Sequence, residues 1–250
     1  MDSSSSVLLE SCVDSVASAI ASAEGGAQRV ELCDNLVEGG TTPSAGMIRS
    51  CVERATIPVF VIIRPRGGDF LYDDDDVAVM AEDIRTAAAL GASGIVIGAL
   101  RAEGTIDREI TRRLLELARP LPVTFHRAFD MTRDLRESLD ALMELGIDRV
   151  LTSGGAPRAL DGTDAIADLV HRAGPQLRVM AGGGVRANHV AQLVERTGVR
   201  EVHARLTESV ESGMRYRAPR GVSRPFTPNE YERVVTSRDA VAMMVKAMTV

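Results

Sequence analysis

The sequence predicts a single-domain α/β fold, a (β/α)8 TIM barrel that occupies residues 7–250 and ends in a C-terminal extension helix. Three observations support this prediction. The 250-residue length fits one barrel domain. Short β-branched runs alternate with helix-like stretches, as parallel sheets require. One glycine-led motif recurs four times without the edge strand or reversal of strand order that an open, doubly wound sheet would show.

The recurring motif is a helix-like stretch that ends at glycine, followed three residues later by a β-branched run. Glycine suits this position because helix C-termini commonly turn through a left-handed conformation before the next strand. The four predicted strands of this series lie in residues 26–33 (GAQRVELC), 91–98 (GASGIVIG), 146–153 (GIDRVLTS) and 198–205 (GVREVHAR).

Four further strands fall midway between these, two of them led by a proline, which is tolerated at the first residue of a strand. Helical apolar spacing fills most of the intervening stretches, for example 76–91 and 136–146. After the last strand we expect a long loop and a helical segment over about 227–248. The four strands are residues 7–12 (VLLESC), 58–64 (PVFVIIR), 122–127 (PVTFHR) and 177–183 (LRVMAGG).

Composition narrows the classes of function. The net charge of −6 and the pI near 5.3 argue against a nucleic-acid partner. No apolar run is long enough to span a membrane. Residues 1–6 (MDSSSS) lack the basic and apolar segments of a secretory signal, and we expect them to be a disordered tail. Three cysteines do not form a disulfide framework in a chain this long, which indicates a reducing cytoplasm.

Alternation within the strands sorts side chains between the barrel interior and the helices. In residues 29–33, Val30 and Leu32 should face the helices, so Glu31 and Cys33 should face the interior. The same reasoning turns His126 inward. Other polar residues expected at the interior or at the C-terminal strand ends are Glu10, Cys12, Arg64, Arg66, Thr124, Arg127, Asp130, Ser153, Glu201, His203 and Arg205.

Functional sites of such barrels lie at the C-terminal ends of the strands. A ligand site is therefore one explanation of this polar rim. The alternative is a structural network of ion pairs, such as Glu31 with Arg64, that fills the barrel. We favour the ligand site because a network needed only for stability has no reason to gather at one rim.

The rim suggests an anionic ligand and acid–base chemistry. Arginines at strand ends would form a local positive cleft. The Gly182, Gly183 and Gly184 turn could present backbone N–H groups at a helix N-terminus, although a tight turn without a ligand is the alternative. Catalytic candidates are Glu10, Glu31, His126 and Asp130, and ligand-binding candidates are Arg64, Arg66, Arg127, Ser153, Gly182, Gly183, Gly184, His203 and Arg205.

The two strand-end thiols point to a different chemistry. Cys12 and Cys33 end adjacent parallel strands and could bind Cu(I), which prefers sulfur ligands. The alternative is two small buried side chains without a ligand.

Several long motifs resemble the CutC copper homeostasis family, from about Leu8 to Arg217: LESCVDSVASA, RVELCDNLVEGGTTPS, PVFVIIRPRGGDFLY, PLPVTFHRAFDMTRD, RVLTSGG and GGGV. The resemblance implies a cytoplasmic TIM barrel, commonly a homodimer or tetramer, that binds Cu(I) through Cys12 and Cys33. It also matches other motif positions, namely Glu10, Asp14, Glu31, Arg64, Arg66, Asp69, His126, Arg127, Asp130, Ser153 and His203.

Three functions therefore stay open. The first is a cytosolic copper homeostasis protein. The second is a hydrolase, lyase or isomerase that acts on a small anionic or sugar-like metabolite, with proton transfer by Glu10, Glu31 and His126. The third is a sensor that binds the same ligand without catalysis.

Overall fold

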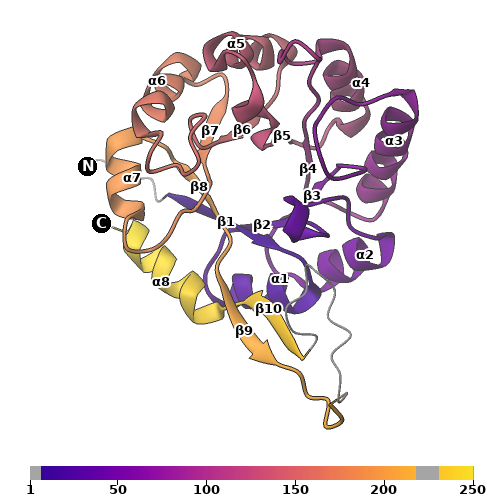
Figure 1. Cartoon of the computed structure of the whole chain (residues 1–250), viewed down its shortest axis with the longest axis vertical. Helices are drawn as coiled ribbons and strands as arrows, with labels where there is room; N and C mark the ends of the chain where they lie inside the picture. Colours follow the sequence, from indigo (N-terminus) through magenta and orange to yellow (C-terminus); the bar gives the residue numbers. More distant parts are fainter. Residues whose placement is uncertain (1–6, 218–230, 250) are drawn as a thin grey trace.

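The computed structural model describes residues 7–217 and 231–249. Eight parallel strands form a closed barrel in sequence order, which confirms the predicted (β/α)8 architecture (Figure 1). The tail expected at residues 1–6 lies outside the described residues. The strands are β1 (Leu8–Val13), β2 (Arg29–Leu32), β3 (Val59–Ile62), β4 (Gly94–Ile97), β5 (Val123–Phe125), β6 (Arg149–Thr152), β7 (Arg178–Ala181) and β8 (Glu201–Ala204).

Helices surround the barrel. The helix predicted as a C-terminal extension packs between the helices that follow β7 and β1, and so completes the ring. The α-helices are α1 (Val16–Glu24), α2 (Ala45–Arg54), α3 (Asp74–Ala89), α4 (Arg108–Ala118), α5 (Leu135–Leu145), α6 (Thr163–Ala173), α7 (Val190–Thr197) and α8 (Arg238–Met248), and the 3-10 helices are η1 (Leu36–Glu38) and η2 (Arg127–Met131).

The helix ends follow the local sequence. Asp73, Asp107 and Asp134 each accept backbone N–H bonds at the start of a helix, which offsets the unpaired donors there. The four glycines of the recurring motif, Gly26, Gly91, Gly146 and Gly198, all have positive φ angles, as predicted.

Two apolar layers hold the barrel together. The larger one lies between the strands and the helices and includes the fully buried Leu9, Val30 and Val202. A smaller cluster lies inside the barrel, where Cys12, Cys33, Phe60, Ile62 and Val96 pack together. Most of the remaining interior is polar, and this positions the site described below.

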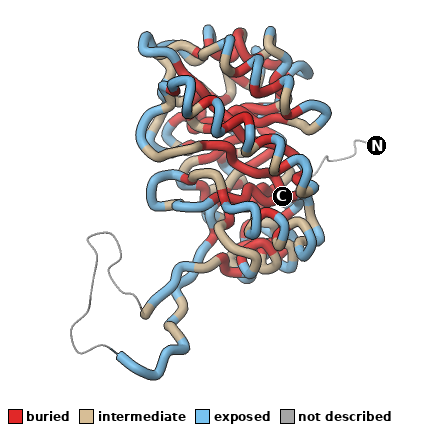
Figure 2. Tube along the Cα trace, turned by 90° about the vertical axis from the view of Figure 1, so that its right-hand side faces the viewer, coloured by how far each residue is buried: buried red, intermediate tan, exposed pale blue. Residues whose placement is uncertain are grey.

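The segment after β8 differs from the prediction. Strands β9 (Thr207–Glu211) and β10 (Glu232–Thr236) form an antiparallel hairpin that projects from the barrel as an exposed arm (Figure 2). The helix expected over about 227–248 is wrong for residues 232–236, which form β10, and the observed helix begins at Arg238. Residues 227–230 lie outside the described residues. The segment 232–236 (ERVVT) contains two adjacent valines, which favour a strand.

Among the described residues, no helix combines the length and the apolar character that crossing a membrane requires.

Candidate ligand and metal site at the barrel mouth

The N-terminal half of the barrel interior is filled by a buried network of four charged side chains. Glu201 accepts a hydrogen bond from Arg29 at 2.6 Å and also pairs with Arg149. Arg29 donates in turn to Glu10. All four are at most 7% exposed. Two carboxylates and two guanidiniums balance one another, as buried charges must.

Phe60 lies within cation–π distance of this network, with its ring centre 4.8 Å from the Arg29 guanidinium carbon and 5.5 Å from that of Arg149. A structural ion-pair network therefore exists, but it lies at the N-terminal ends of the strands. The network considered from the sequence, with Glu31 paired to Arg64, would lie at the opposite rim. No ion pair between Glu31 and Arg64 occurs in the part of the chain that the structure describes.

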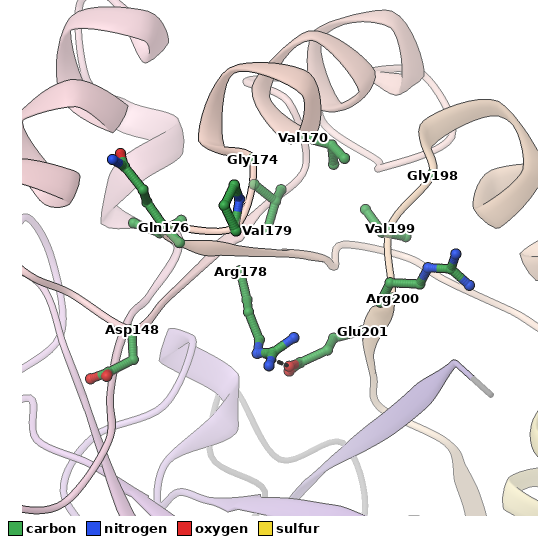
Figure 3. Close-up of a pocket in the computed structure, with 12 residues that line it drawn as sticks. Asp148, Val170, Gly174, Gln176, Arg178, Val179, Gly198, Val199, Arg200 and Glu201 are labelled. Carbon is green, nitrogen blue, oxygen red and sulfur yellow. Dashed lines mark ion pairs between the residues drawn. The ribbon is translucent and has the colours of Figure 1, made fainter. Parts of the chain in front are cut away.

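A hollow of about 430 Å³ also lies at this N-terminal end (Figure 3). It is bordered by the segments that follow the C-terminal ends of α6 and α7, and Arg178 reaches across it to Glu201 at 3.7 Å. Catalytic sites of these barrels lie at the other face. We therefore place the candidate site at the smaller cavity of the barrel mouth.

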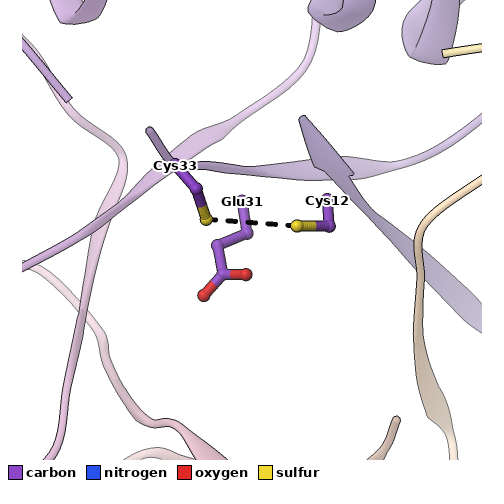
Figure 4. Close-up of side chains that lie close together, drawn as sticks. All are labelled: Cys12, Glu31 and Cys33. Carbon is purple, nitrogen blue, oxygen red and sulfur yellow. Dashed lines mark hydrogen bonds between the residues drawn. The ribbon is translucent and has the colours of Figure 1, made fainter. Parts of the chain in front are cut away.

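The two predicted thiols meet at that mouth (Figure 4). Cys12 Sγ and Cys33 Sγ are 4.0 Å apart, and both side chains are buried. The strand register places Cys12 beside Glu31. Ligand atoms of Cys12, Glu31 and Cys33 all lie within 4.8 Å of one another, so these three residues could hold one metal ion.

His203 connects the thiols to the ion network below. Its Nδ1 lies 2.9 Å from Glu10, and its Nε2 lies 3.7 Å from Glu31. Burial opposes a charged imidazole, but hydrogen bonds with Cys12 and Glu10 raise the pKa of His203 well above its ordinary value. Burial likewise opposes ionisation of Glu10, yet Arg29 and His203 lower its pKa to about 2.

The two thiols have unequal acidity. A hydrogen bond from Cys33, supported by His203 against the opposing effect of burial, lowers the pKa of Cys12 to about 5. The same hydrogen bond, together with burial, raises the pKa of Cys33 well above the ordinary thiol value. Burial raises the pKa of Glu31 to about 8 despite His203. At neutral pH the cluster therefore contains a Cys12 thiolate that accepts from the Cys33 thiol.

A cavity of about 120 Å³ opens beside the thiols. Loop residues contribute to its wall together with strand residues from several sides of the barrel. It is lined by Cys12, Glu31, Gly39, Ile62, Arg64, Phe70, His126, Arg127, Leu151 and His203.

Arg64 lies at this cavity with its side chain buried. Its two terminal nitrogens donate to the carbonyl oxygens of Glu38, Gly40 and Gly68 at 2.8–2.9 Å. Its guanidinium carbon lies 4.9 Å from the centre of the Phe70 ring. These bonds fix the guanidinium but do not neutralise its charge, because carbonyl oxygens carry only partial charges.

His126 also packs against Phe70, with ring centres 4.9 Å apart. It is the N-cap residue of η2, and its Nδ1 accepts the N–H of Ala128 at 3.1 Å. Gly98 provides the space for the ring, because a Cβ atom at that position would overlap the imidazole. Burial, together with the positive charge of Arg64, lowers the pKa of His126 to about 3.

This low pKa has a measurable effect on stability. The unfolded chain binds a proton at His126 below the ordinary pKa of 6.5, whereas the folded chain does not until the pH approaches 3. Stability is therefore lost as the pH falls through this range. Between pH 6.5 and 4.5, wild type should lose about 2 kcal/mol more unfolding free energy than His126→Phe, measured by urea unfolding at each pH. Parallel profiles for wild type and His126→Phe would contradict the prediction.

Asp130 connects the loop after β5 to the loop after β6. Its carboxylate accepts hydrogen bonds from Arg127 Nε, the Thr152 hydroxyl, and the backbone N–H groups of Ser153 and Gly155. Ser153 also accepts a bond from Arg127 at 2.8 Å. Of these residues, only Arg127 lines the cavity. Asp130 and Ser153 thus lie behind it and hold Arg127 in place.

Three other candidates lie away from the cavity. Arg66 is bonded to Asp76 and to the carbonyl of Leu71. The inward orientation predicted for Arg205 is wrong, because β8 ends at Ala204 and strand alternation does not extend to this exposed residue. Glu10 lies beneath the cavity, within the ion network.

The glycine turn after β7 also differs from the expected helix N-terminal cradle. Five residues separate Gly184 from the start of α7 at Val190. A Cβ atom at Gly182 would meet Leu151 and His203, and one at Gly183 would meet Ser153 and Arg127. The absence of side chains here allows β7 to pack closely against its neighbours.

Sequence reasoning missed Arg29 and Arg149 in the ion network, and Gly39, Ile62, Phe70 and Leu151 in the cavity wall. Alternation would have found the strand residues among these, since Arg29 shares a face with Glu31, and Leu151 shares one with Arg149. Phe70 and Gly39 come from loops, where no periodic signal exists.

Comparison with known proteins gives consistent matches. A model of the CutC family matches residues 7–208. Proteins named copper homeostasis protein cutC homolog from mouse and human are 50% and 49% identical to this chain over 210 residues, covering 84% of this chain and 77% of each relative. A Caulobacter vibrioides protein named as a family protein CutC is 47% identical over 242 residues, 97% of both chains.

Solved structures agree on the fold. A CutC structure from Streptococcus agalactiae superposes with a TM-score of 0.75 at 37% identity, covering 79% of this chain and 97% of that one. The N-(5'-phosphoribosyl)anthranilate isomerase of Pyrococcus furiosus has a TM-score of 0.58 at 15% identity over 97% of this chain and 98% of its own, a likeness of fold alone.

Proposed function

Because the chain belongs to the CutC family, we propose that it is a cytosolic copper homeostasis protein that binds Cu(I) through Cys12 and Cys33. The observation that carries this proposal is the 4.0 Å separation of the two sulfur atoms. A metal–thiolate bond is about 2.3 Å long, so both sulfurs can contact one ion with little movement of the strands. Cu(I) is the soft ion that prefers such ligands.

The surroundings of the thiols support the proposal. Both cysteines are buried, which limits access of water and oxidants to a bound ion. Cys12 has a lowered pKa and therefore offers a thiolate at neutral pH, and the nearby Glu31 could supply a third ligand. The relatives whose names refer to copper homeostasis are about half identical to this chain.

Removal of both thiols should abolish tight copper binding. We expect Cys12→Ser/Cys33→Ser to bind Cu(I) at least 100-fold more weakly than wild type, a loss of about 2.7 kcal/mol. The measurement is an anaerobic titration against a competing Cu(I) chelator. Serine keeps the side-chain size but replaces a soft ligand by a hard one.

The third cysteine provides a matched control. Cys51 is buried in α2, outside the barrel interior, so Cys51→Ser should bind Cu(I) as wild type does. Equal Cu(I) affinities for wild type and the double variant would rule out the thiol site.

A second candidate function is an enzyme that acts on a small anionic metabolite at the same mouth. The observation that favours it is the cavity itself, because a site for copper alone has no need of a hollow lined by Arg64 and His126. We also propose a homo-oligomer, a dimer or tetramer, as the family resemblance implies. Light scattering on the eluting protein would measure its mass.

A further inference from the structure

We propose that the mouth cavity binds a small monocarboxylate, whose oxygens accept a hydrogen bond from His126 Nε2 and lie against the guanidinium of Arg64. This site does not depend on copper binding. It rests on the second candidate function, because both require a ligand in this cavity. It adds the chemical class of that ligand.

The first observation is a hydrogen-bond donor without an acceptor. Because His126 Nδ1 accepts the Ala128 N–H, the neutral ring carries its proton on Nε2. That Nε2 is buried and has no hydrogen-bond partner among the described residues. An unsatisfied buried donor costs about 1–3 kcal/mol. The ring lines the cavity, so a ligand oxygen bound there would satisfy it.

The second observation is a buried positive charge without an anion. Arg64 is only 4% exposed, and within residues 7–217 and 231–249 no carboxylate forms an ion pair with it. Buried charges are normally paired. The carbonyl groups of Glu38, Gly40 and Gly68 immobilise the guanidinium, so it cannot move to an anion elsewhere in the protein. An anion that neutralises it must therefore bind beside it. A ligand in the adjoining cavity could supply that charge.

The size and walls of the cavity define the rest of the ligand. A volume of about 120 Å³ is roughly that of four water molecules in the liquid, so the ligand has a body of a few carbon atoms at most. Ile62, Phe70 and Leu151 line it with apolar groups. A carboxylate with a short aliphatic chain fits both parts of the cavity, the polar part at His126 and Arg64 and the apolar walls. Phosphate fits less well, because its charged oxygens would point in all directions, including toward these apolar walls.

The donor pair is separate from the thiol pair. Of the two cysteines, Cys12 lines the cavity and Cys33 does not, and no hydrogen bond joins His126 or Arg64 to either of them among the described residues. Carboxylate binding should therefore survive Cys33→Ser, which removes one proposed copper ligand and leaves the cavity wall intact. This separates a failure of the present proposal from a failure of the copper proposal.

The experiment is an NMR titration of full-length protein labelled with ¹⁵N in histidine. The chain has only four histidines, so His126 can be assigned by comparison with variants. We expect acetate and propionate to produce saturable shifts of the His126 Nε2 and ring signals, whereas the neutral acetamide and propionamide do not. His126→Phe, which keeps an aromatic ring against Phe70, should weaken propionate binding at least tenfold in calorimetry, and His171→Phe should not change it.

Three results with the wild-type protein would overturn the proposal. The first is the absence of a saturable shift at His126 in wild type up to roughly 50 mM propionate, which needs no variant to fold. The second is amide binding equal to carboxylate binding, and the third is tighter binding of inorganic phosphate. Propionate affinity within threefold of wild type in Cys33→Ser, whose changed residue does not line the cavity, would support the proposal, and loss of binding in that variant would contradict it.

Discussion

Glu201→Gln is expected to lower the free energy of unfolding by about 3–5 kcal/mol, because it leaves buried guanidinium charge without its partner. Glu201 accepts from Arg29 and Arg149, both buried inside the barrel. After the substitution, Glu10 alone would face two guanidiniums. Glutamine keeps the shape of the side chain, so the effect reports the lost charge rather than lost packing. Urea unfolding of both proteins at pH 7 measures it.

An exposed ion pair serves as the control. Asp164 pairs with Arg196 at 3.1 Å, and its side chain is 97% exposed. Asp164→Asn should change the unfolding free energy by less than about 1 kcal/mol, as is typical of surface pairs. If Glu201→Gln had an equally small effect, the four-residue network would not be what balances the charges inside the barrel.

Asp130→Ala should cost about 3 kcal/mol of unfolding free energy and should loosen the loop after β6. The carboxylate accepts from its own loop and from the end of β6 and the loop after it, and hydrogen bonds to a buried charged acceptor contribute more than neutral ones. Hydrogen exchange should accelerate at the amides of Ser153 and Gly155, which would lose their acceptor. Urea unfolding and amide exchange are the two measurements.

Asp161 offers the matched comparison for this prediction. Its carboxylate pairs with Arg158 at the surface, and Asp161→Ala should leave both stability and the exchange of Ser153 and Gly155 nearly unchanged. Unaltered exchange at these amides in Asp130→Ala would show that the loop does not depend on Asp130.

The sequence predicted most of what lies within the strands. Backbone geometry forces side chains to alternate, so the residue pattern alone was enough to place Glu31, Cys33 and His126 inside the barrel. The closed barrel brings the thiols of β1 and the end of β2 together, since parallel neighbours keep a fixed spacing. The glycine motif was equally informative because it marks a backbone conformation rather than a contact.

The errors occurred where the chain leaves the strands. Arg205 and Arg66 lie in segments whose direction depends on tertiary contacts, so alternation could not place them. Strands β9 and β10 pair although about 20 residues separate them in the sequence, a non-local contact that leaves no periodic pattern. Asp130 was predicted as a catalytic candidate from its position after a strand, and only its hydrogen-bond donors reveal its part in holding two loops together.

The bare backbone at Gly98 limits how the mouth can change during evolution. His126 occupies the volume that a side chain at this position would need. Gly98→Ala would add one methyl group and displace the imidazole from its place between β4 and Phe70, even though alanine has the smallest side chain after glycine. The position of His126 at the cavity therefore depends on the hydrogen atom that Gly98 carries in place of a side chain. Gly98 itself has no side chain that could contact a ligand.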